Sequence, residues 1–330
     1  MLEKRTCLIL GAGASAHLGF PVGAALKNDI LKELKRMITE NGLKDYPPEI
    51  QDSDEDLNEF YRLLNMGIWD SPDAFLEDHP EFKNTGKYLI CKQLAEKEKA
   101  SNFIDNMGWY QKLMKAIRVN HPDKLKDNEL SIITFNYDRS LDYRLHEFVY
   151  AHYGIKDADE AWQIVENSID IIHVHGTLGE YPKYEYGSIE NIYERSQKIK
   201  IISEVANDAE KRDDGFVNYE FKRASELLHK AERVVVFGFG FAEDNVERLH
   251  FFEKKEFEDG TEWKEKRDII VATGGYLDPV DSHEKREWLK RWGLRRGNQF
   301  PHAQGNYFEA DTRQIFSKYV NPFPTKIEPK

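Results

Sequence analysis

The sequence predicts an α/β fold built on a buried parallel sheet with helices on both faces. Short, continuous apolar segments recur along the chain, which is typical of strands that are buried on both sides. Longer charged stretches with helical periodicity separate these segments. A glycine-rich or polar motif follows directly after several of them. Because ligands of open parallel sheets collect at the carboxyl ends of the strands, this placement predicts a binding site there.

Five segments are the expected strands. They are short, rich in β-branched or aromatic residues, and continuous rather than alternating in polarity. They cover Thr6–Leu10, Ser131–Phe135, Ile169–Val174, Val234–Phe237 and Asp268–Thr273.

The expected helices lie between these strands. The first covers Val22–Glu40, repeats its leucine and isoleucine residues on one face, and stops at Asn41-Gly42. Further amphipathic pieces are Leu57–Met66, Pro72–Leu76, Gly86–Lys99 and Phe103–Val119. We therefore expect one domain over residues 1–320, with helical insertions at about 43–130 and 180–230. The proline-containing residues 321–330 are expected to form a loose tail.

Composition and charge exclude several classes of protein. Apolar residues make up 40% of the 330, enough for a core, and 47 basic against 59 acidic residues give a net charge of −12. Such a chain repels nucleic-acid backbones overall, so we expect no autonomous nucleic-acid binding. No apolar run reaches the roughly 20 residues of a membrane span, and Cys7–Leu10 is too short for a signal peptide. We expect a soluble, cytoplasmic protein.

The turn at Gly11–Ala16 fits the pattern G-x-G-x-x-A directly after a strand. Glycines there let backbone N–H groups approach a pyrophosphate, although a plain strand-to-helix turn explains the pattern equally well. A dehydrogenase would need an acidic residue at the end of a second strand about 20 positions on. The acids in that window, Asp29 and Glu33, lie within the first predicted helix. The sequence therefore disfavours hydride transfer and predicts a different Rossmann-like protein.

Four motifs in chain order resemble those of the sirtuin superfamily. They are GAGASAHLGFP at Gly11–Pro21, FNYD at Phe135–Asp138, VHG at Val174–Gly176 and FGFGF at Phe237–Phe241. The first resembles the sirtuin glycine turn, and the second resembles its Gln-Asn-Ile-Asp segment. The third is similar to the catalytic His-Gly pair, and the fourth takes the place of the later Gly-Thr-Ser nucleotide turn.

The departures from that family indicate which branch the chain resembles. Two cysteines cannot build the four-cysteine zinc module of the deacylating sirtuins. Val22-Gly23-Ala24 replaces the family Asp-Phe-Arg, and Phe135 replaces the family Gln. The chain thus looks more like the sirtuin-like NAD hydrolases of bacterial antiphage defence. Its length is similar to that of stand-alone effectors, so the resemblance implies a homo-oligomer and a HerA-type hexameric ATPase as partner.

The resemblance implies NAD as substrate, nicotinamide and ADP-ribose as products, and no metal. Asn136 is the candidate for orienting a water molecule, because an amide both donates and accepts. His175 is the candidate base, since an imidazole titrates near neutrality. Asp138 would accept from the nicotinamide carboxamide. The other expected dinucleotide contacts are Gly11, Ala12, Gly13, Ser15, Gly238, Gly240 and Phe241.

Each of these residue assignments has a structural alternative. Asn136 and Asp138 could form an Asx turn that caps a helix starting near Arg139. We interpret His173 as a structural histidine rather than a metal ligand. Asp244 and Asn245 are expected to cap a helix over Val246–Phe252, with a ribose contact as the alternative. Gly238 and Gly240 could serve only a sharp turn. The basic run Lys285–Arg296 is expected to be an amphipathic helix with a solvated or partner-facing side rather than an RNA-binding helix.

Two further functions stay open at this point. The missing family Arg and Gln favour a non-hydrolytic subunit that binds NAD or ADP-ribose and regulates a partner. A zinc-free deacylase is the third reading. The sequence also leaves open whether the ADP-ribose product is linear or cyclic.

Overall fold

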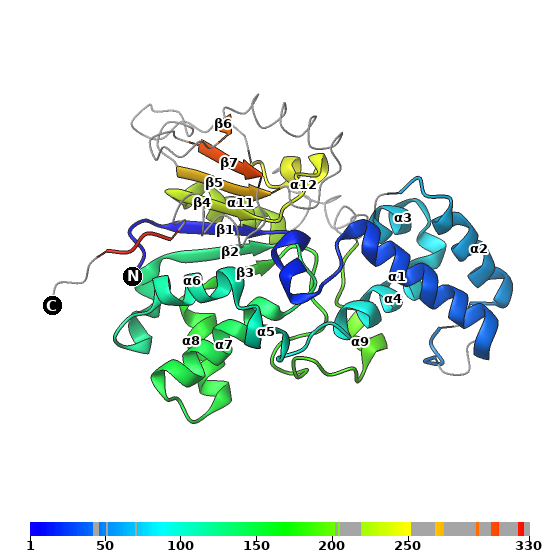
Figure 1. The fold of residues 1–330 in the computed structure, drawn as a ribbon, viewed down its shortest axis with the longest axis horizontal. Coiled ribbons are helices and arrows are strands. Elements are labelled where there is room, and N and C mark those ends of the chain that lie inside the picture. The colour runs from blue at the N-terminus through cyan, green and yellow to red at the C-terminus, as the bar shows by residue number, and fades with distance from the viewer. Residues whose placement is uncertain are drawn as a thin grey trace.

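The structure is a computed structural model that describes residues 1–41, 46–50, 52–69, 71–201, 204, 219–251, 268–273, 295–296, 305–309 and 323–326. Its strands form one parallel sheet of seven in the order β3-β2-β1-β4-β5-β7-β6 (Figure 1). The central strand β1 (Thr6–Leu10) pairs with β2 on one side and with β4 on the other. The strand order therefore reverses between β1 and β4, and ligands of such sheets bind beside that switch point.

The five predicted strands are confirmed, with small shifts at their ends. They are β1, β2 (Leu130–Thr134), β3 (Asp170–His173), β4 (Arg233–Phe237) and β5 (Asp268–Thr273). Every residue of β1, β2 and β4 is buried, which is why these segments are mostly apolar and do not alternate in polarity.

Two additional strands, β6 (Arg295–Arg296) and β7 (Gly305–Glu309), extend the sheet beyond β5. The sequence predicts neither, because β6 is too short for a pattern and β7 contains polar residues. The helix expected over Lys285–Arg296 is wrong at its last two residues, which form β6. The rest of that segment lies outside the described residues.

Helices cover both faces of the sheet. Leu8 and Leu10 of β1 belong to an apolar cluster that includes α7 (Ser140–Tyr153) and α8 (Ala158–Ser168). Cys7 and Ile9, which point to the other face, belong to a second cluster with α11 (Tyr219–Lys230) and α12 (Glu243–Arg248). The predicted fold class, a Rossmann-like parallel sheet between helices, is confirmed.

A helical region lies between β1 and β2. It contains α1 (Gly23–Arg36), α2 (Asp54–Asn65), α3 (Pro72–Asp78), α4 (Lys83–Ala95), α5 (Asn102–Asp105) and α6 (Gly108–Ile117). Figure 1 shows α1 to α4 beyond the carboxyl ends of the strands. The start of α2 is fixed by a capping box, in which Ser53 and Asp56 bond to each other's backbone N–H.

The expectation of one helical piece over Phe103–Val119 is wrong, because two helices occupy it. They are separated before Gly108, which has a left-handed φ of +52°. A Cβ atom on Gly108 would lie 2.7 Å from His17 Nε2, so this break lets α6 begin close to the segment that follows β1. Trp109 at the start of α6 then donates from Nε1 to Ala14 O (3.0 Å).

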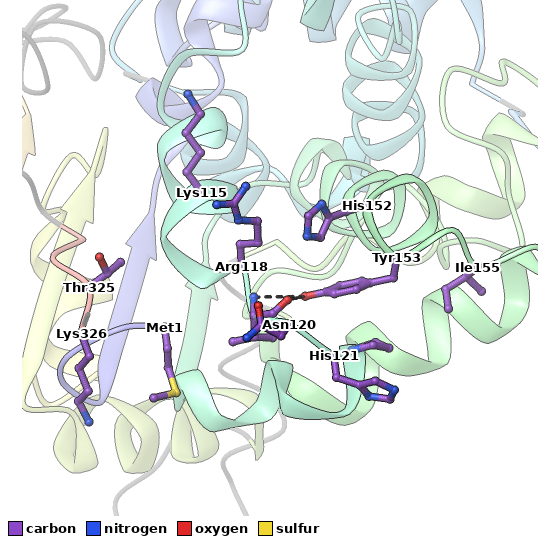
Figure 2. A pocket seen from close by; sticks show the side chains of 12 residues that line it. Met1, Lys115, Arg118, Asn120, His121, His152, Tyr153, Ile155, Thr325 and Lys326 are labelled. Carbon is purple, nitrogen blue, oxygen red and sulfur yellow. Dashed lines mark hydrogen bonds between the residues drawn. The ribbon is translucent and has the colours of Figure 1, made fainter. Parts of the chain in front are cut away.

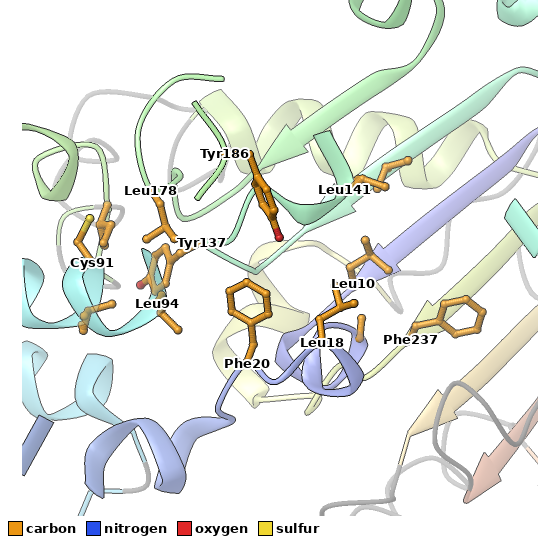
Figure 3. Close-up of a cluster of buried hydrophobic side chains, with 14 of the residues drawn as sticks. Leu10, Leu18, Phe20, Cys91, Leu94, Tyr137, Leu141, Leu178, Tyr186 and Phe237 are labelled. Atoms are coloured by element: carbon orange, nitrogen blue, oxygen red, sulfur yellow. The ribbon is translucent and has the colours of Figure 1, made fainter. Parts of the chain in front are cut away.

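Apolar side chains join the sheet to the helical region (Figure 3). Leu10 and Phe237 come from the ends of β1 and β4, and Phe20 from the segment before α1. Cys91 and Leu94 come from α4. All of these side chains are at most 6% exposed, so the helices are packed against the strand ends rather than tethered to them.

A buried ion cluster lies at the start of α7. Glu98 receives hydrogen bonds from the Arg139 side chain (Nε–Oε1 3.1 Å, Nη2–Oε2 2.5 Å) and from the Arg139 backbone N–H (3.0 Å). Arg195, which follows in α9 (Ile192–Ser196), places Nη2 3.6 Å from the same carboxylate. All three side chains are fully buried. One carboxylate therefore compensates two guanidinium groups in the interior.

The chain end is not loose where the structure describes it. Phe323 is 1% exposed and packs edge-on against Phe237 at 6.0 Å. The Glu3 N–H donates to Pro324 O (3.2 Å), and the Lys326 N–H donates to Met1 O (3.0 Å). The expectation of a loose tail is therefore wrong for residues 323–326. Among the helices of the described chain, none is long and apolar enough to cross a bilayer.

Candidate functional site

The glycine-rich turns after β1 and β4 touch each other at the switch point of the sheet. The Gly11 N–H donates to Phe237 O (3.0 Å). The Gly13 N–H donates to Gly238 O (3.1 Å). A Cβ atom on Gly11 would lie 2.6 Å from Gly238 O, and one on Gly238 would lie 2.1 Å from Ala14 N. These glycines therefore have a structural role, the contact between two backbone turns, whatever ligand binds there.

We expect Gly238→Ala to destabilise the protein. Gly238 has a left-handed φ of +59°, which costs other residues about 1–3 kcal/mol, and the added Cβ would also clash with the turn after β1. Thermal unfolding should show a lower Tm than for Gly240→Ala, because a Cβ atom on Gly240 would meet no described atom within 4 Å. Equal changes in the two variants would contradict this assignment.

Three of the predicted site residues meet beside the first turn. Asn136 Nδ2 donates to Ser15 Oγ (3.2 Å), and Ser15 Oγ donates to Asp138 Oδ2 (2.9 Å). Asp138 Oδ1 accepts the N–H of Ser140 (3.1 Å) at the start of α7. The predicted Asx turn is thus present at Asp138, and the same carboxylate also holds Ser15. Burial raises the pKa of Asp138, while the hydrogen bonds from Ser140 and Ser15 lower it less.

Asn136 is 8% exposed, and only one end of its side-chain amide is hydrogen-bonded. Its Nδ2 atom donates to Ser15, and its backbone N–H donates to Thr134 Oγ1 (3.1 Å). Its Oδ1 atom is buried and accepts no hydrogen bond from any described residue. A buried amide oxygen without a donor is costly, and such atoms are rare outside sites that bind a ligand or an ordered water.

His175 occupies the turn after the neighbouring strand. The His175 carbonyl accepts the N–H of Lys200 (2.8 Å). The next residue, Gly176, has a φ of +73° and a missing Cβ that would lie 1.9 Å from Lys198 O. This close approach explains why glycine follows the histidine. The imidazole, which is 7% exposed, packs against Phe135 at 5.6 Å and Phe221 at 5.9 Å.

The His175 imidazole is neutral at physiological pH. Burial lowers its pKa to about 4, and the nearby Arg248 guanidinium lowers it further, while Asn245 and the Lys200 backbone act in the opposite direction. The Nδ1 atom is buried and has no hydrogen-bond partner within the described part of the chain. We refer to Asn136 Oδ1 and to His175 Nδ1, taken in the tautomer that carries its proton on Nε2, as the two open acceptors.

The backbone segments that carry the open acceptors are adjacent. Thr134 of β2 pairs with His173 of β3, and each acceptor lies two residues after one partner of that pair. The rings on both sides of Asn136 are near His175, with Phe135 at 5.6 Å and Tyr137 at 6.4 Å. The Asn136 side chain points towards Ser15, however, and no described contact joins it directly to His175.

His173 is a structural histidine, as predicted. Its Nε2 atom lies 3.2 Å from Asp142 Oδ1, and its Nδ1 atom lies 3.4 Å from Asn136 O. Burial lowers the pKa of His173, but Asp142, the Asn136 backbone and Asp138 together raise it, and the net shift is upward. The ring thereby fixes the backbone of Asn136. In the part of the chain that the structure describes, no group of three or more potential ligands could hold a metal.

The remaining predicted contacts differ in accessibility. Ala12 and Gly240 are exposed at the ends of β1 and β4, where a ligand can reach them. Phe241 is 6% exposed, and its ring packs against Phe239 at 5.0 Å and Phe251 at 6.0 Å. The Phe241 ring is therefore part of the apolar cluster beside the site.

The expected capping role of Asp244 and Asn245 is wrong, because the helix begins earlier. Helix α12 starts at Glu243 with Ala242 as its N-cap. Asn245 thus lies inside the helix, where its Oδ1 atom is buried and finds no described hydrogen-bond donor. Arg248 is a site neighbour that the sequence does not single out. A helix that begins directly after the glycine turn at Gly238 and Gly240 would include both Asn245 and Arg248. That pattern is the signal in the sequence that could have identified both residues.

A separate groove of about 750 Å³ contains none of the predicted site residues (Figure 2). Lys115 and Arg118 line it at the end of α6, and His152 and Tyr153 line it at the end of α7. Basic side chains at the carboxyl ends of helices stabilise the helix dipole. This accounts for the positive charge of the groove without a ligand.

Comparison with known proteins identifies the family. The sequence profile of the SIR2-like domain matches residues 130–296, just over half of the chain. The protein belongs to the SIR2-like domain family. The matched residues run from the first residue of β2 to the last residue of β6, and thus include both open acceptors. The glycine turn at Gly11–Ala16 precedes the matched range.

Other comparisons add little to this SIR2-like assignment. No curated protein matched the chain. Among the solved structures that match is Sir2Tm bound to a propionylated peptide, at 13% identity and a TM-score of 0.32, with 96% of this chain and 94% of that chain covered. Membership in the SIR2-like family implies the binding or use of NAD. The open acceptors and the exposed strand ends at the switch point fit such a ligand.

Proposed function

We propose that this protein is an NAD hydrolase that cleaves the nicotinamide–ribose bond and releases nicotinamide and ADP-ribose. The observation that carries the proposal is the pair of open acceptors at the carboxyl ends of β2 and β3. Both atoms are buried and unsatisfied within the described residues, so the site is complete only when a ligand supplies hydrogen-bond donors. The hydroxyl groups of a ribose and a water molecule are donors of that kind.

The side chains at this site are suited to the cleavage of an N-glycosidic bond. Cleavage of an N-glycosidic bond passes through an oxocarbenium-like state that a water molecule captures. Asn136 Oδ1 can orient that water, because the opposite end of its amide is already fixed by Ser15. The neutral His175 ring can accept a proton from the water or from a ribose hydroxyl. Asp138 holds Ser15, and so keeps the Asn136 amide in place.

The proposal predicts an unusual pH profile. If neutral His175 acts as the base, kcat/KM for NAD should fall only near pH 4, because the pKa of the folded imidazole is lowered to about 4. Between pH 6.5 and 4 the unfolded chain binds the proton and the folded chain does not, so acidification also destabilises the fold. The measurement is nicotinamide release against pH. A fall of kcat/KM near pH 6.5 instead would show that His175 is not the base in this environment.

The direct test is incubation of the purified protein with NAD, with nicotinamide and ADP-ribose followed by chromatography. Stoichiometric release of both products supports the proposal. The appearance of cyclic ADP-ribose instead would mean that a hydroxyl group of the substrate, not water, captures the cation. The His175→Ala variant should lose the activity, and His152→Ala, a change at an exposed histidine in the separate groove, should keep it.

A second candidate is a non-hydrolytic subunit that binds NAD or ADP-ribose. The observation that favours it is the state of Asp138, whose two oxygens already accept from Ser140 and Ser15. That carboxylate then has less capacity for the nicotinamide carboxamide than the resemblance implies. Calorimetry that shows NAD binding, beside chromatography that shows no nicotinamide release, would support this candidate over the hydrolase.

We also propose that the protein works in the cytoplasm as a NAD-depleting antiphage effector that assembles with itself and with a HerA-type ATPase. The support is the resemblance to stand-alone effectors. Induced expression with the ATPase should lower cellular NAD, and His175→Ala should prevent the fall. Co-purification of the two proteins tests the assembly. Unchanged NAD on expression with the ATPase would contradict the effector role.

A further inference from the structure

Helix α12 brings two unused polar atoms to the His175 side of the site. Arg248 Nη1 and Asn245 Oδ1 are both buried, and neither has a hydrogen-bond partner among the residues described. The helix is held in place by Val246 (4% exposed) and Leu249 (fully buried), which belong to the same apolar cluster as Val174 beside His175. The Asn245 side chain also interacts with the His175 imidazole and raises its pKa, so α12 lies directly against this ring.

The four unsatisfied atoms around the site have complementary chemistry. Asn136 Oδ1, His175 Nδ1 and Asn245 Oδ1 are acceptors, and they require hydroxyl or amide donors. Arg248 Nη1 is a cationic donor, and it requires an anion. A sugar that carries both hydroxyl groups and a phosphate meets both requirements. A sugar without phosphate would leave the buried Nη1 atom of Arg248 without an acceptor, and a buried donor that makes no hydrogen bond is costly.

We propose that Arg248 and Asn245 bind the phosphoribosyl part of the substrate, with Arg248 on a phosphate oxygen and Asn245 on a ribose hydroxyl. This inference rests on the proposed function for the identity of the substrate. It assigns the phosphate contact to a guanidinium on α12, although the family Arg is replaced at Val22-Gly23-Ala24 near the first glycine turn. Helix α12, which follows β4 along the chain, would then hold the substrate at that end of the site.

The closeness of Arg248 to His175 has a consequence in the absence of ligand. The guanidinium favours the neutral imidazole, so its removal should raise the pKa of His175. Because burial is the larger cause, the pKa should stay below that of an exposed histidine. In the complex, a bound phosphate would neutralise the guanidinium and raise the pKa of His175 as the substrate enters, which would make the imidazole a better base.

The test is calorimetry with ADP-ribose, which carries the phosphoribosyl group but cannot turn over. Arg248→Gln should weaken binding about 10- to 100-fold, because a charged hydrogen bond is lost, and Arg248→Lys should restore part of the affinity. Asn245→Ala should weaken binding less. Arg62→Gln is the matched control, since Arg62 is an exposed arginine paired with Glu59 on α2. Unchanged affinity in Arg248→Gln would overturn the inference.

Two comparisons separate this inference from the proposed function. Ribose 5-phosphate and ribose, titrated in parallel, should differ in affinity for the wild type and become similar for Arg248→Gln. The pKa of His175, measured by NMR without ligand, should rise in Arg248→Gln and stay unchanged in Arg62→Gln. If ADP-ribose binding depends on Arg248 but NAD is not cleaved, the proposed function fails and the phosphate contact stands. If NAD is cleaved and Arg248→Gln binds ADP-ribose normally, the proposed function stands and the phosphate contact fails.

Discussion

Asn136→Ala should reduce nicotinamide release by about 100- to 1000-fold, the usual loss when a hydrogen-bonding group that acts on the transition state is removed. The amide is fixed at Nδ2 by Ser15 and leaves Oδ1 for the ligand. Substitution removes that oxygen and the hydrogen bond from Nδ2 to Ser15, but it leaves the pairing of β1 with β2 intact. The fold should therefore be retained. The measurement is kcat with NAD, accompanied by thermal unfolding.

The matched control for this prediction is Ser15→Ala. Ser15 holds both Asn136 and Asp138 through its hydroxyl group and is 2% exposed, so its main effect on the reaction should be to position these two side chains. Its loss should lower kcat less than the loss of Asn136. If Asn136→Ala keeps near wild-type activity while folded, the oriented-water role of this amide is wrong.

Glu98→Gln should destabilise the protein by about 3–5 kcal/mol, as expected when one partner of a buried ion pair is neutralised. Glu98, Arg139 and Arg195 are fully buried, and Glu98 is the carboxylate that both guanidinium groups face. The substitution keeps the shape of the side chain but leaves the positive charges without a counter-charge. Urea unfolding followed by fluorescence or circular dichroism provides the free energy of unfolding.

The control for Glu98→Gln is Glu59→Gln, which removes an equivalent charge from an exposed pair with Arg62. Exposed pairs contribute little, so this variant should unfold near the wild-type midpoint. Similar midpoints for the two variants would show that the Glu98 cluster contributes no more than a surface pair. Because Arg139 follows Asp138, a large effect would also link the position of the site to this cluster.

The sheet could be predicted from sequence because strands that are buried on both faces are mostly apolar and do not alternate in polarity, and this pattern is visible in the sequence. Thr6–Leu10 and Asp268–Thr273 are continuous apolar segments, and they form β1 and β5 with those same boundaries. The first helix and the structural role of His173 also follow from local patterns. The position of Ser15, Asn136 and Asp138 beside one another follows from parallel pairing, which brings the carboxyl ends of β1 and β2 to one edge.

Other features depend on contacts between distant segments and leave no local pattern. The counter-charge of Arg139 is Glu98, which lies 41 positions away in the sequence. Strand β7 is recognised only by its pairing with β5 and β6. The contact between the two glycine turns can be recognised only when both backbone segments are placed in three dimensions. The sequence predicts a helix that starts after Asn245 and therefore a capping role for this residue, and only the structure places it inside α12.

The central claim is that a dinucleotide crosses the ends of β1 and β4 with its nicotinamide ribose at the two open acceptors. The most direct measurement is a crystal structure of the Asn136→Ala variant soaked with NAD. We predict intact NAD with the anomeric carbon facing the space left at position 136 and the His175 ring, and with a phosphate near Arg248. Density for NAD in the groove at Lys115 and Arg118, or with the nicotinamide ribose away from His175, would contradict it.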